Sequence, residues 1–294
     1  MIAVEDLRKR YGKTLAVDGL SFTVEPGRVV GFLGPNGAGK TTTLRILLGL
    51  VRANSGRATI LGKSYSQLER PFCQVGAVLE ASGFHPGRKA RNHLRVLARA
   101  GHASKTRVDE VLKIVGLEGA ARKRVGGYSL GMRQRLALAA ALLGDPGVLI
   151  LDEPANGLDP EGIRWLRDLL RSLAAEGRAV LISSHVLAEI EQTADEVVII
   201  NKGKFVAHGS VESLTRSSEG RVRVRSPQAA KLEKQLTKAG LKVDVDGDAL
   251  LVAGGSSSKV GEIAAKSQVV LHELTPIATQ LEDVFFALTT EEKR

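Results

Sequence analysis

The sequence has 294 residues, of which 43% are hydrophobic, and its formal net charge at pH 7 is +10. This length has room for one large domain and one small domain, and no apolar run approaches the roughly 20 residues that a membrane-spanning helix needs. The first residues lack the basic and apolar regions of a signal peptide, and a single cysteine, Cys73, excludes an internal disulfide. These features predict a soluble, intracellular protein.

Strands dominate the start of the chain. Alternation of apolar and polar residues predicts antiparallel strands over residues 2–7 and 20–24, with Tyr11 at the turn between them. Residues 29–33 form an apolar run that is typical of a buried strand, and the helical spacing after them predicts a helix over residues 42–50. Further strands are predicted over residues 57–61 and 75–79.

Helices and strands alternate in the middle of the chain. Helical spacing predicts helices over residues 90–100, 106–115 and 129–143. The next predicted elements are strands over 148–151, 179–183 and 196–200, helices over 160–176 and 186–193, and a hairpin arm over 203–208. Since these strands alternate with helices, we expect an α/β core with a largely parallel sheet.

A polar stretch at residues 215–220 predicts a linker. Short strands and helices alternate again beyond it, with a strand predicted over residues 269–274, which indicates a second, small α+β domain. We therefore expect a large domain over residues 1–214, with a helical part at about residues 85–143, and an accessory domain over residues 220–294.

The positive charge is concentrated in one segment. Residues 85–135 contain 13 Lys and Arg against 3 Asp and Glu, which leaves a local excess of +10, as large as that of the whole chain. Such a segment is either a solvated helical face or a surface for an acidic partner. The candidate partners are an anionic membrane surface, an acidic subunit and nucleic acid.

A glycine-rich stretch follows the predicted strand at residues 29–33. It contains Gly34, Pro35, Asn36, Gly37, Ala38, Gly39, Lys40, Thr41 and Thr42. The stretch fits the phosphate-binding pattern G-x-x-x-x-G-K-[ST] in the strand–loop–helix setting that this pattern requires. The glycines let backbone N–H groups approach phosphate oxygens. Lys40 would reach the β and γ phosphates, and Thr41 would bring its hydroxyl to Mg²⁺.

Two carboxylates, Asp152 and Glu153, follow the predicted strand over residues 148–151. In phosphate-loop ATPases such a strand lies beside the strand that leads into the loop. The first carboxylate then faces Mg²⁺ and the second faces the attacking water, which it can orient and deprotonate. We therefore predict that Asp152 is a metal ligand and that Glu153 is the catalytic base.

These motifs resemble those of the nucleotide-binding subunit of ABC transporters, over residues 1 to about 214. Tyr11 matches the aromatic residue that stacks on adenine in that family. Ser129 and Gly131 match the family's signature loop, and Asp159 lies in the loop that follows the second carboxylate. His185 matches the switch histidine that contacts the γ-phosphate.

The signature loop departs from the family pattern. Leu130 stands where the first glycine of LSGGQ is usual, and Met132 stands where the glutamine is usual. Ser129 and Gly131 remain, so that a hydroxyl and a backbone N–H are still available to a nucleotide. A second departure is Glu80, which replaces the family's usual glutamine after the strand at residues 75–79. Its carboxylate is a hard oxygen ligand that could bind Mg²⁺ or water.

The resemblance implies a P-loop NTPase fold: an ABC ATPase core with a mixed sheet, an antiparallel β part and a helical insert, followed by the small α+β accessory domain. It also implies a homodimer whose two copies pack head to tail. Each ATP, with its Mg²⁺, would be bound by Lys40, Thr41 and Asp152 of one copy and capped by Ser129 and Gly131 of the other.

The resemblance further implies that Glu153 activates water while His185 and Glu80 sense the γ-phosphate. Closing and opening of the dimer would drive transmembrane permease subunits made as a separate chain, which places the protein peripherally at the cytoplasmic face of the membrane. The basic helical insert would contact those subunits. The stretches over residues 78–88, 155–159 and 281–289 resemble bacterial exporters of antibiotics and other drugs.

Two other functions compete with this interpretation. A soluble ATPase of the same superfamily could act on nucleic acid or ribosomes through the basic insert, but such proteins usually carry two ATPase units or a long coiled coil. Aromatic residues make up only 4% of the chain, which leaves little material for base stacking, so nucleic acid is not the expected partner. A regulatory module that uses ATP only as a clamp would not need Lys40, Asp152, Glu153 and His185 together.

Overall fold

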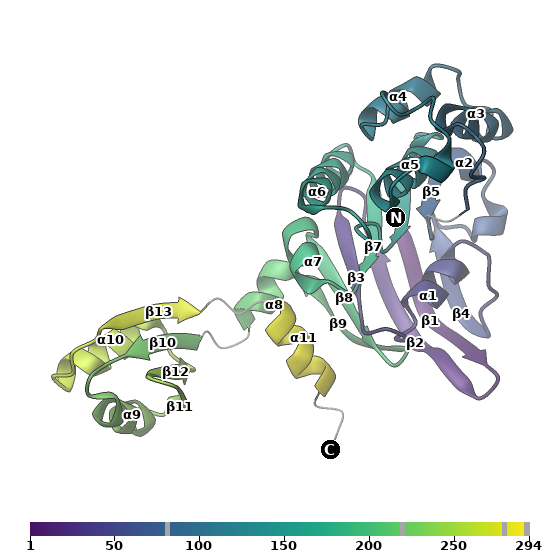
Figure 1. Cartoon of the computed structure of the whole chain (residues 1–294). Coiled ribbons are helices and arrows are strands. Elements are labelled where there is room, and N and C mark those ends of the chain that lie inside the picture. Colours follow the sequence, from purple (N-terminus) through teal and green to yellow (C-terminus); the bar gives the residue numbers. More distant parts are fainter. Residues whose placement is uncertain (80–82, 218–220, 278–280, 291–294) are drawn as a thin grey trace. The chain divides into compact units, whose positions relative to one another are not determined.

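The computed structural model describes residues 1–79, 83–217, 221–277 and 281–290 (Figure 1). The chain forms two compact units, Met1–Gly209 and Ser210–Arg294. Sequence analysis placed the end of the large domain at residue 214, but helix α8 (Val211–Ser217) belongs to the second unit and packs against helix α11 (Leu281–Thr290). In the described part of the chain, every helix is too short or too polar to cross a bilayer.

The first unit is built on a six-stranded sheet. The strands, in spatial order, are β5 (Val75–Val78), β6 (Val148–Asp152), β7 (Ala179–Ser184), β3 (Val29–Leu33), β8 (Glu196–Asn201) and β9 (Lys204–Ser210). The pairs from β5 to β8 are parallel. Every residue of β3, β6 and β7 is buried, as expected for parallel strands that are covered on both faces. The predicted α/β core is therefore confirmed. The expectation that β6 lies directly beside β3 is wrong, because β7 pairs with both strands and separates them.

An antiparallel sheet of three strands completes the β part of this unit. Its order is β2 (Thr14–Val24), β1 (Ile2–Tyr11) and β4 (Ser55–Ile60). Both β1 and β2 are longer than predicted. In β1 the ladder is irregular between Val4 and Arg8, where Asp6 has a φ of +42°. Such a bulge breaks the alternation on which the sequence prediction depended. Tyr11, predicted at a turn, is the last residue of β1.

Helices cover the parallel sheet on both faces (Figure 1). Helix α1 (Lys40–Leu47) contacts β2, β4 and β6, whereas α6 (Pro160–Ala175) and α7 (Leu187–Thr193) contact β3 and β7. The core joins both sheets and α1, and Phe22 of β2 stacks on Phe32 of β3 with ring centroids 5.2 Å apart. Burial of these apolar faces is the main stabilising contribution to this unit.

The basic segment forms the predicted helical insert. Its helices are α3 (Ala90–Ala100), α4 (Arg107–Ile114) and α5 (Leu130–Leu142), and they lie together at one end of the first unit (Figure 1). A short helix, α2 (Pro71–Gln74), and two 3₁₀ turns, η1 (Tyr65–Gln67) and η2 (Val125–Gly127), were not predicted. They are too short to produce a periodic apolar pattern.

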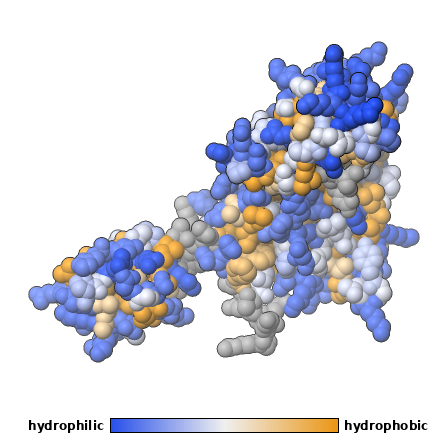
Figure 2. Space-filling model, in the orientation of Figure 1, coloured by the Kyte–Doolittle hydropathy of each residue, from blue (hydrophilic) through white to orange (hydrophobic). Residues whose placement is uncertain are grey.

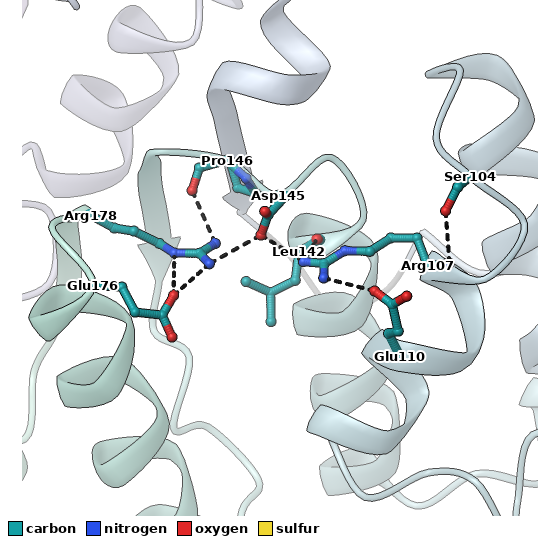
Figure 3. Close-up of polar contacts among 8 residues, drawn as sticks. All are labelled: Ser104, Arg107, Glu110, Leu142, Asp145, Pro146, Glu176 and Arg178. Atoms are coloured by element: carbon teal, nitrogen blue, oxygen red, sulfur yellow. Dashed lines mark hydrogen bonds and ion pairs between the residues drawn. The ribbon is translucent and has the colours of Figure 1, made fainter.

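An ion-pair network ties this insert to the parallel sheet (Figure 3). Asp145 follows α5, and its Oδ1 forms ion pairs with two arginines. One is Arg107 of α4, at 2.8 Å, and the other is Arg178, which precedes β7, at 3.1 Å. Each arginine is also held by a second acid, Glu110 for Arg107 and Glu176 for Arg178. Asp145 therefore links elements that lie far apart in the sequence.

The second unit contains a βαββαβ arrangement of the ferredoxin-like kind. Its elements are β10 (Arg221–Arg225), α9 (Ala229–Lys238), β11 (Lys242–Asp246), β12 (Ala249–Ala253), α10 (Ser257–Lys266) and β13 (Glu273–Ile277). The sheet is antiparallel, in the order β11-β12-β10-β13, over an apolar core. The last strand was predicted at residues 269–274; it starts later because the N–H of Val269 caps α10 at Ala264.

Replacing Asp145 tests the network. In the variant Asp145→Asn both arginines lose a charged acceptor, but each keeps a carbonyl acceptor, Leu142 or Pro146. The side chain of Asp145 is 62% exposed, so that the free energy of unfolding should fall by only about 1 kcal/mol. Urea denaturation measures this change. Asp168→Asn is the control, since Asp168 is equally exposed but pairs with its neighbour Arg167; an equal effect in both variants would contradict a linking role for Asp145.

Candidate functional site

The glycine-rich loop connects β3 to α1. Gly39 has a φ of +103° at the N-cap of α1, and a Cβ there would lie 2.3 Å from the carbonyl oxygen of Ala16. A Cβ at Gly34 would lie 2.6 Å from the carbonyl oxygen of Ile200. Only glycine fits these two positions, and the loop that results leads directly to the free N–H groups of the first turn of α1. A helix N-terminus of this kind attracts phosphate.

Lys40, the first residue of α1, lies against this loop with only 7% of its surface exposed. Its ammonium donates to the carbonyl oxygen of Gly34 at 2.5 Å and lies 4.0 Å from Oε1 of Glu153. Burial lowers the pKa of Lys40, while the charges of Glu153 and Asp152 act in the opposite direction. A partly desolvated ammonium, held beside glycine N–H groups, is suited to bind the oxygens of a polyphosphate.

Asp152, at the end of β6, accepts two hydroxyl groups. Oγ1 of Thr41 donates to its Oδ2 at 2.7 Å, and the hydroxyl of Ser183, in β7, donates to its Oδ1. Thr41 and Asp152 thus bring the hydroxyl and the carboxylate oxygens that Mg²⁺ prefers to one place. Across the described residues, His, Cys, Asp and Glu side chains form no cluster of three that could hold a metal by itself.

Glu153 adopts a φ of +49°, and its N–H donates to the carbonyl oxygen and to the hydroxyl of Ser183, at 3.2 and 3.0 Å. The turn directs its carboxylate toward His185, whose Nδ1 is 2.8 Å from Oε2 of Glu153. Positive φ in a residue other than glycine costs about 1–3 kcal/mol and is concentrated at functional sites. The structure therefore brings together Lys40, Glu153 and His185.

Sequence analysis missed two polar residues of this site. Ser183 bridges Asp152 and the backbone of Glu153, and the signal for it was a hydroxyl near the end of a buried strand. Glu189 of α7 interacts electrostatically with His185 and Glu153; burial raises its pKa, the charge of His185 lowers it and that of Glu153 raises it. Its signal was a carboxylate four residues after His185.

The residues of the signature loop lie elsewhere on the first unit. Ser129 is the N-cap of α5 and accepts a hydrogen bond from the N–H of Met132 at 3.2 Å. Leu130 is 57% exposed and lies against Gly157, and Asp159 caps α6 through the N–H of Gly162 at 2.8 Å. Among the described residues, Ser129 makes no hydrogen bond with the phosphate-binding loop of its own chain.

The remaining predicted residues have simpler surroundings. Tyr11 is 48% exposed, with the ammonium of Lys9 4.8 Å from its ring centroid. Asn36 and Gly37 are exposed at the tip of the loop, whereas Ala38 is buried. Glu80, the predicted auxiliary metal ligand, lies outside the described residues.

Comparisons with known proteins agree with the resemblance in the motifs. The family model for ABC transporters matches residues 17–156, and that of a domain of unknown function (DUF8746) matches residues 220–282. The bacitracin transport ATP-binding protein of Bacillus licheniformis is 38% identical over 98% of this chain and 97% of its own length. The Nod factor export ATP-binding protein I of Burkholderia pseudomallei (strain 1710b) is 36% identical over 99% and 97%.

Solved structures show the same fold. An ATP-binding subunit of an ABC transporter is 29% identical, with a TM-score of 0.67 over 74% of this chain and 92% of its own. A dimeric bacterial ABC transporter cassette, 23% identical, has a TM-score of 0.66 over 71% and 98%. With relatives 36–38% identical along almost its entire length, the chain belongs to the ABC transporter family, as an ATP-binding subunit with ATPase activity.

Proposed function

We propose that this chain powers a bacterial exporter of a drug or antibiotic, as a homodimer bound to a separate transmembrane permease at the cytoplasmic face of the membrane. The observation that carries the ATPase part is the convergence of Lys40, Asp152 and Glu153 at the carboxyl ends of the parallel strands β3 and β6. The export part is supported by the two relatives named for bacitracin transport and Nod factor export.

In this proposal the glycine loop and Lys40 bind the phosphates of ATP. Thr41 and Asp152 would hold Mg²⁺, which supplies positive charge to the phosphate oxygens. Glu153 accepts the proton of the attacking water, and His185 orients Glu153 through the 2.8 Å contact between its Nδ1 and Oε2 of Glu153. Ser183 fixes both carboxylates, since its hydroxyl binds Asp152 and the backbone of Glu153.

A second copy of the chain would complete the site. The contacts of Ser129 and Gly131 with their own chain leave the exposed N-terminal end of α5 available to the nucleotide of a partner copy. Tyr11 offers a half-exposed ring for stacking on adenine, and Asp159 holds the loop between Glu153 and α6 in place. The accessory domain over residues 220–294 would reinforce pairing of the two copies.

Replacing Glu153 by glutamine tests its role. Glu153→Gln keeps the shape of the side chain but removes the proton acceptor, so that turnover should fall by about 10²- to 10⁴-fold while ATP binding persists. Phosphate release gives the rate, and gel filtration with ATP detects the trapped dimer. Glu161→Gln, on the exposed first turn of α6, is the control and should hydrolyse ATP normally. A Glu153→Gln protein with the parent rate would remove Glu153 as the base.

Replacing Ser183 separates positioning from proton transfer. Ser183→Ala leaves both carboxylates in place but removes the hydroxyl between them, which should lower kcat by about tenfold or more with little change in the affinity for ATP. Ser184→Ala is the matched control, because the described contacts of the Ser184 hydroxyl are with Val186 alone. Steady-state kinetics should show a clear loss in the first variant only; equal losses would rule out the bridging role of Ser183.

Purification from membranes tests the transport function. We expect the chain to co-purify with a permease of several membrane spans, and the pair, reconstituted in vesicles, to move an antibiotic such as bacitracin in an ATP-dependent manner that Glu153→Gln abolishes. Recovery of nucleic acid or ribosomes, together with ATPase activity that they stimulate, would instead favour the soluble ATPase.

A further inference from the structure

A basic pocket lies in the helical insert, outside the nucleotide site. It has a volume of about 600 Å³ and is formed by the end of α3, the turn that follows it and the start of α4. Its lining residues are Arg95, Ala98, Arg99, His102, Ala103, Ser104, Lys105 and Val108. Figure 2 shows strongly hydrophilic side chains gathered over this end of the first unit. No acidic residue belongs to the lining.

The four basic side chains of this pocket, Arg95, Arg99, His102 and Lys105, are not neutralised within the described part of the chain. None of the ion pairs there involves any of them. The nearest acids in sequence are already engaged: Asp109 pairs with Arg91 at 3.0 Å, and Glu110 pairs with Arg107 at 3.2 Å. Basic groups that share a pocket without a counter-charge repel one another, and a bound anion would relieve that repulsion.

The arrangement of these groups fits phosphate. Arg95 and Arg99 are one helical turn apart and therefore share a face of α3, and each guanidinium can donate two parallel hydrogen bonds to a phosphate. Lys105 lies on the turn that closes the pocket. The hydroxyl of Ser104, on the same turn, accepts a hydrogen bond from the N–H of Arg107 at 3.2 Å and so holds the turn against α4. Phe, Tyr and Trp are absent from the described lining, so that a stacked nucleic-acid base has no platform there.

The pocket is also larger than a free phosphate ion alone would fill. Its volume is that of a site for a small organic molecule, and Ala98, Ala103 and Val108 supply apolar surface. Val96, beside Arg95 on α3, is 51% exposed. Basic groups next to exposed apolar groups are typical of surfaces that contact anionic lipid.

We propose that this pocket binds the phosphate-bearing headgroup of an anionic membrane lipid. The phosphate chemistry follows from the pocket itself, whereas the choice of a lipid as its source rests on the proposed function, which places the protein at a membrane. The bound lipid would hold the helical insert against the bilayer beside the permease.

Vesicle binding of the full-length protein tests this proposal. The probes are vesicles of phosphatidylcholine, with and without phosphatidylglycerol, and the variant is Arg95→Gln with Arg99→Gln. Each basic group near a membrane surface contributes about 1 kcal/mol, which is about fivefold in affinity, so that the double variant should bind the anionic vesicles at least tenfold more weakly. The matched control is Arg122→Gln with Lys123→Gln, which removes two exposed charges of the same insert outside the pocket and should weaken binding clearly less than the Arg95/Arg99 variant does.

If both double variants bound anionic vesicles equally weakly, the attraction would be diffuse and the proposed lipid site would be wrong. The proposal would also be wrong if neither double variant bound the vesicles more weakly than the parent protein. Loss of binding to inorganic phosphate or to polyglutamate in the Arg95/Arg99 variant, with vesicle binding retained, would replace the lipid by a free anion or an acidic protein segment. ATP hydrolysis without vesicles should be unchanged in both variants. A protein that does not bind the vesicles can therefore still be an ATPase. Conversely, if the parent protein did not hydrolyse ATP, vesicle binding could still be measured and would still test the pocket.

Discussion

Parallel strand pairing at one edge of the sheet is the constraint on which the site depends. Leu33 at the end of β3 pairs with Ser184 of β7, and Asp152 at the end of β6 pairs with Ser183 of the same strand. Strand β7 lies between β3 and β6. The register therefore places the glycine loop after β3 and the carboxylates of Asp152 and Glu153 at the same height along the strands, at their carboxyl ends. The Thr41–Asp152 hydrogen bond of 2.7 Å follows directly from this register.

The same edge concentrates unfavourable local conformations. Glu153, which is not a glycine, has a positive φ, and Lys40 is largely withdrawn from water. These features oppose folding, by about 1–3 kcal/mol for a strained residue such as Glu153, and they persist because buried strands on either side fix the backbone. Groups that are already oriented and partly desolvated need little rearrangement to act on a phosphate, which is the basis of electrostatic catalysis.

The helical insert has a different physical character. It carries the basic excess of the chain, and Asp145 ties it to the core through Arg107 and Arg178. Those two arginines are matched by acids, whereas the arginines of the α3–α4 pocket are not. Charge in this insert is thus of two kinds: paired charges connect it to the sheet, whereas Arg95, Arg99 and Lys105 form no ion pair within the described residues, which is the basis of the proposed anion site.

Sequence alone determined the family, the α/β core and the order of most elements. Local spacing sufficed, because the glycine loop, the carboxylate pair and helical periodicity each lie within a short stretch of chain. It did not determine the full length of β1, where a bulge at Asp6 breaks the alternation, or the start of β13. Only the tertiary structure decided that Ser183 bridges Asp152 and Glu153, and that Arg95, Arg99, His102 and Lys105 share one pocket. Strand register joins Ser183 to Glu153, 30 positions away in the sequence, and the turn between α3 and α4 folds back so that its residues line the same pocket as α3. Neither arrangement leaves a periodic signal in the chain.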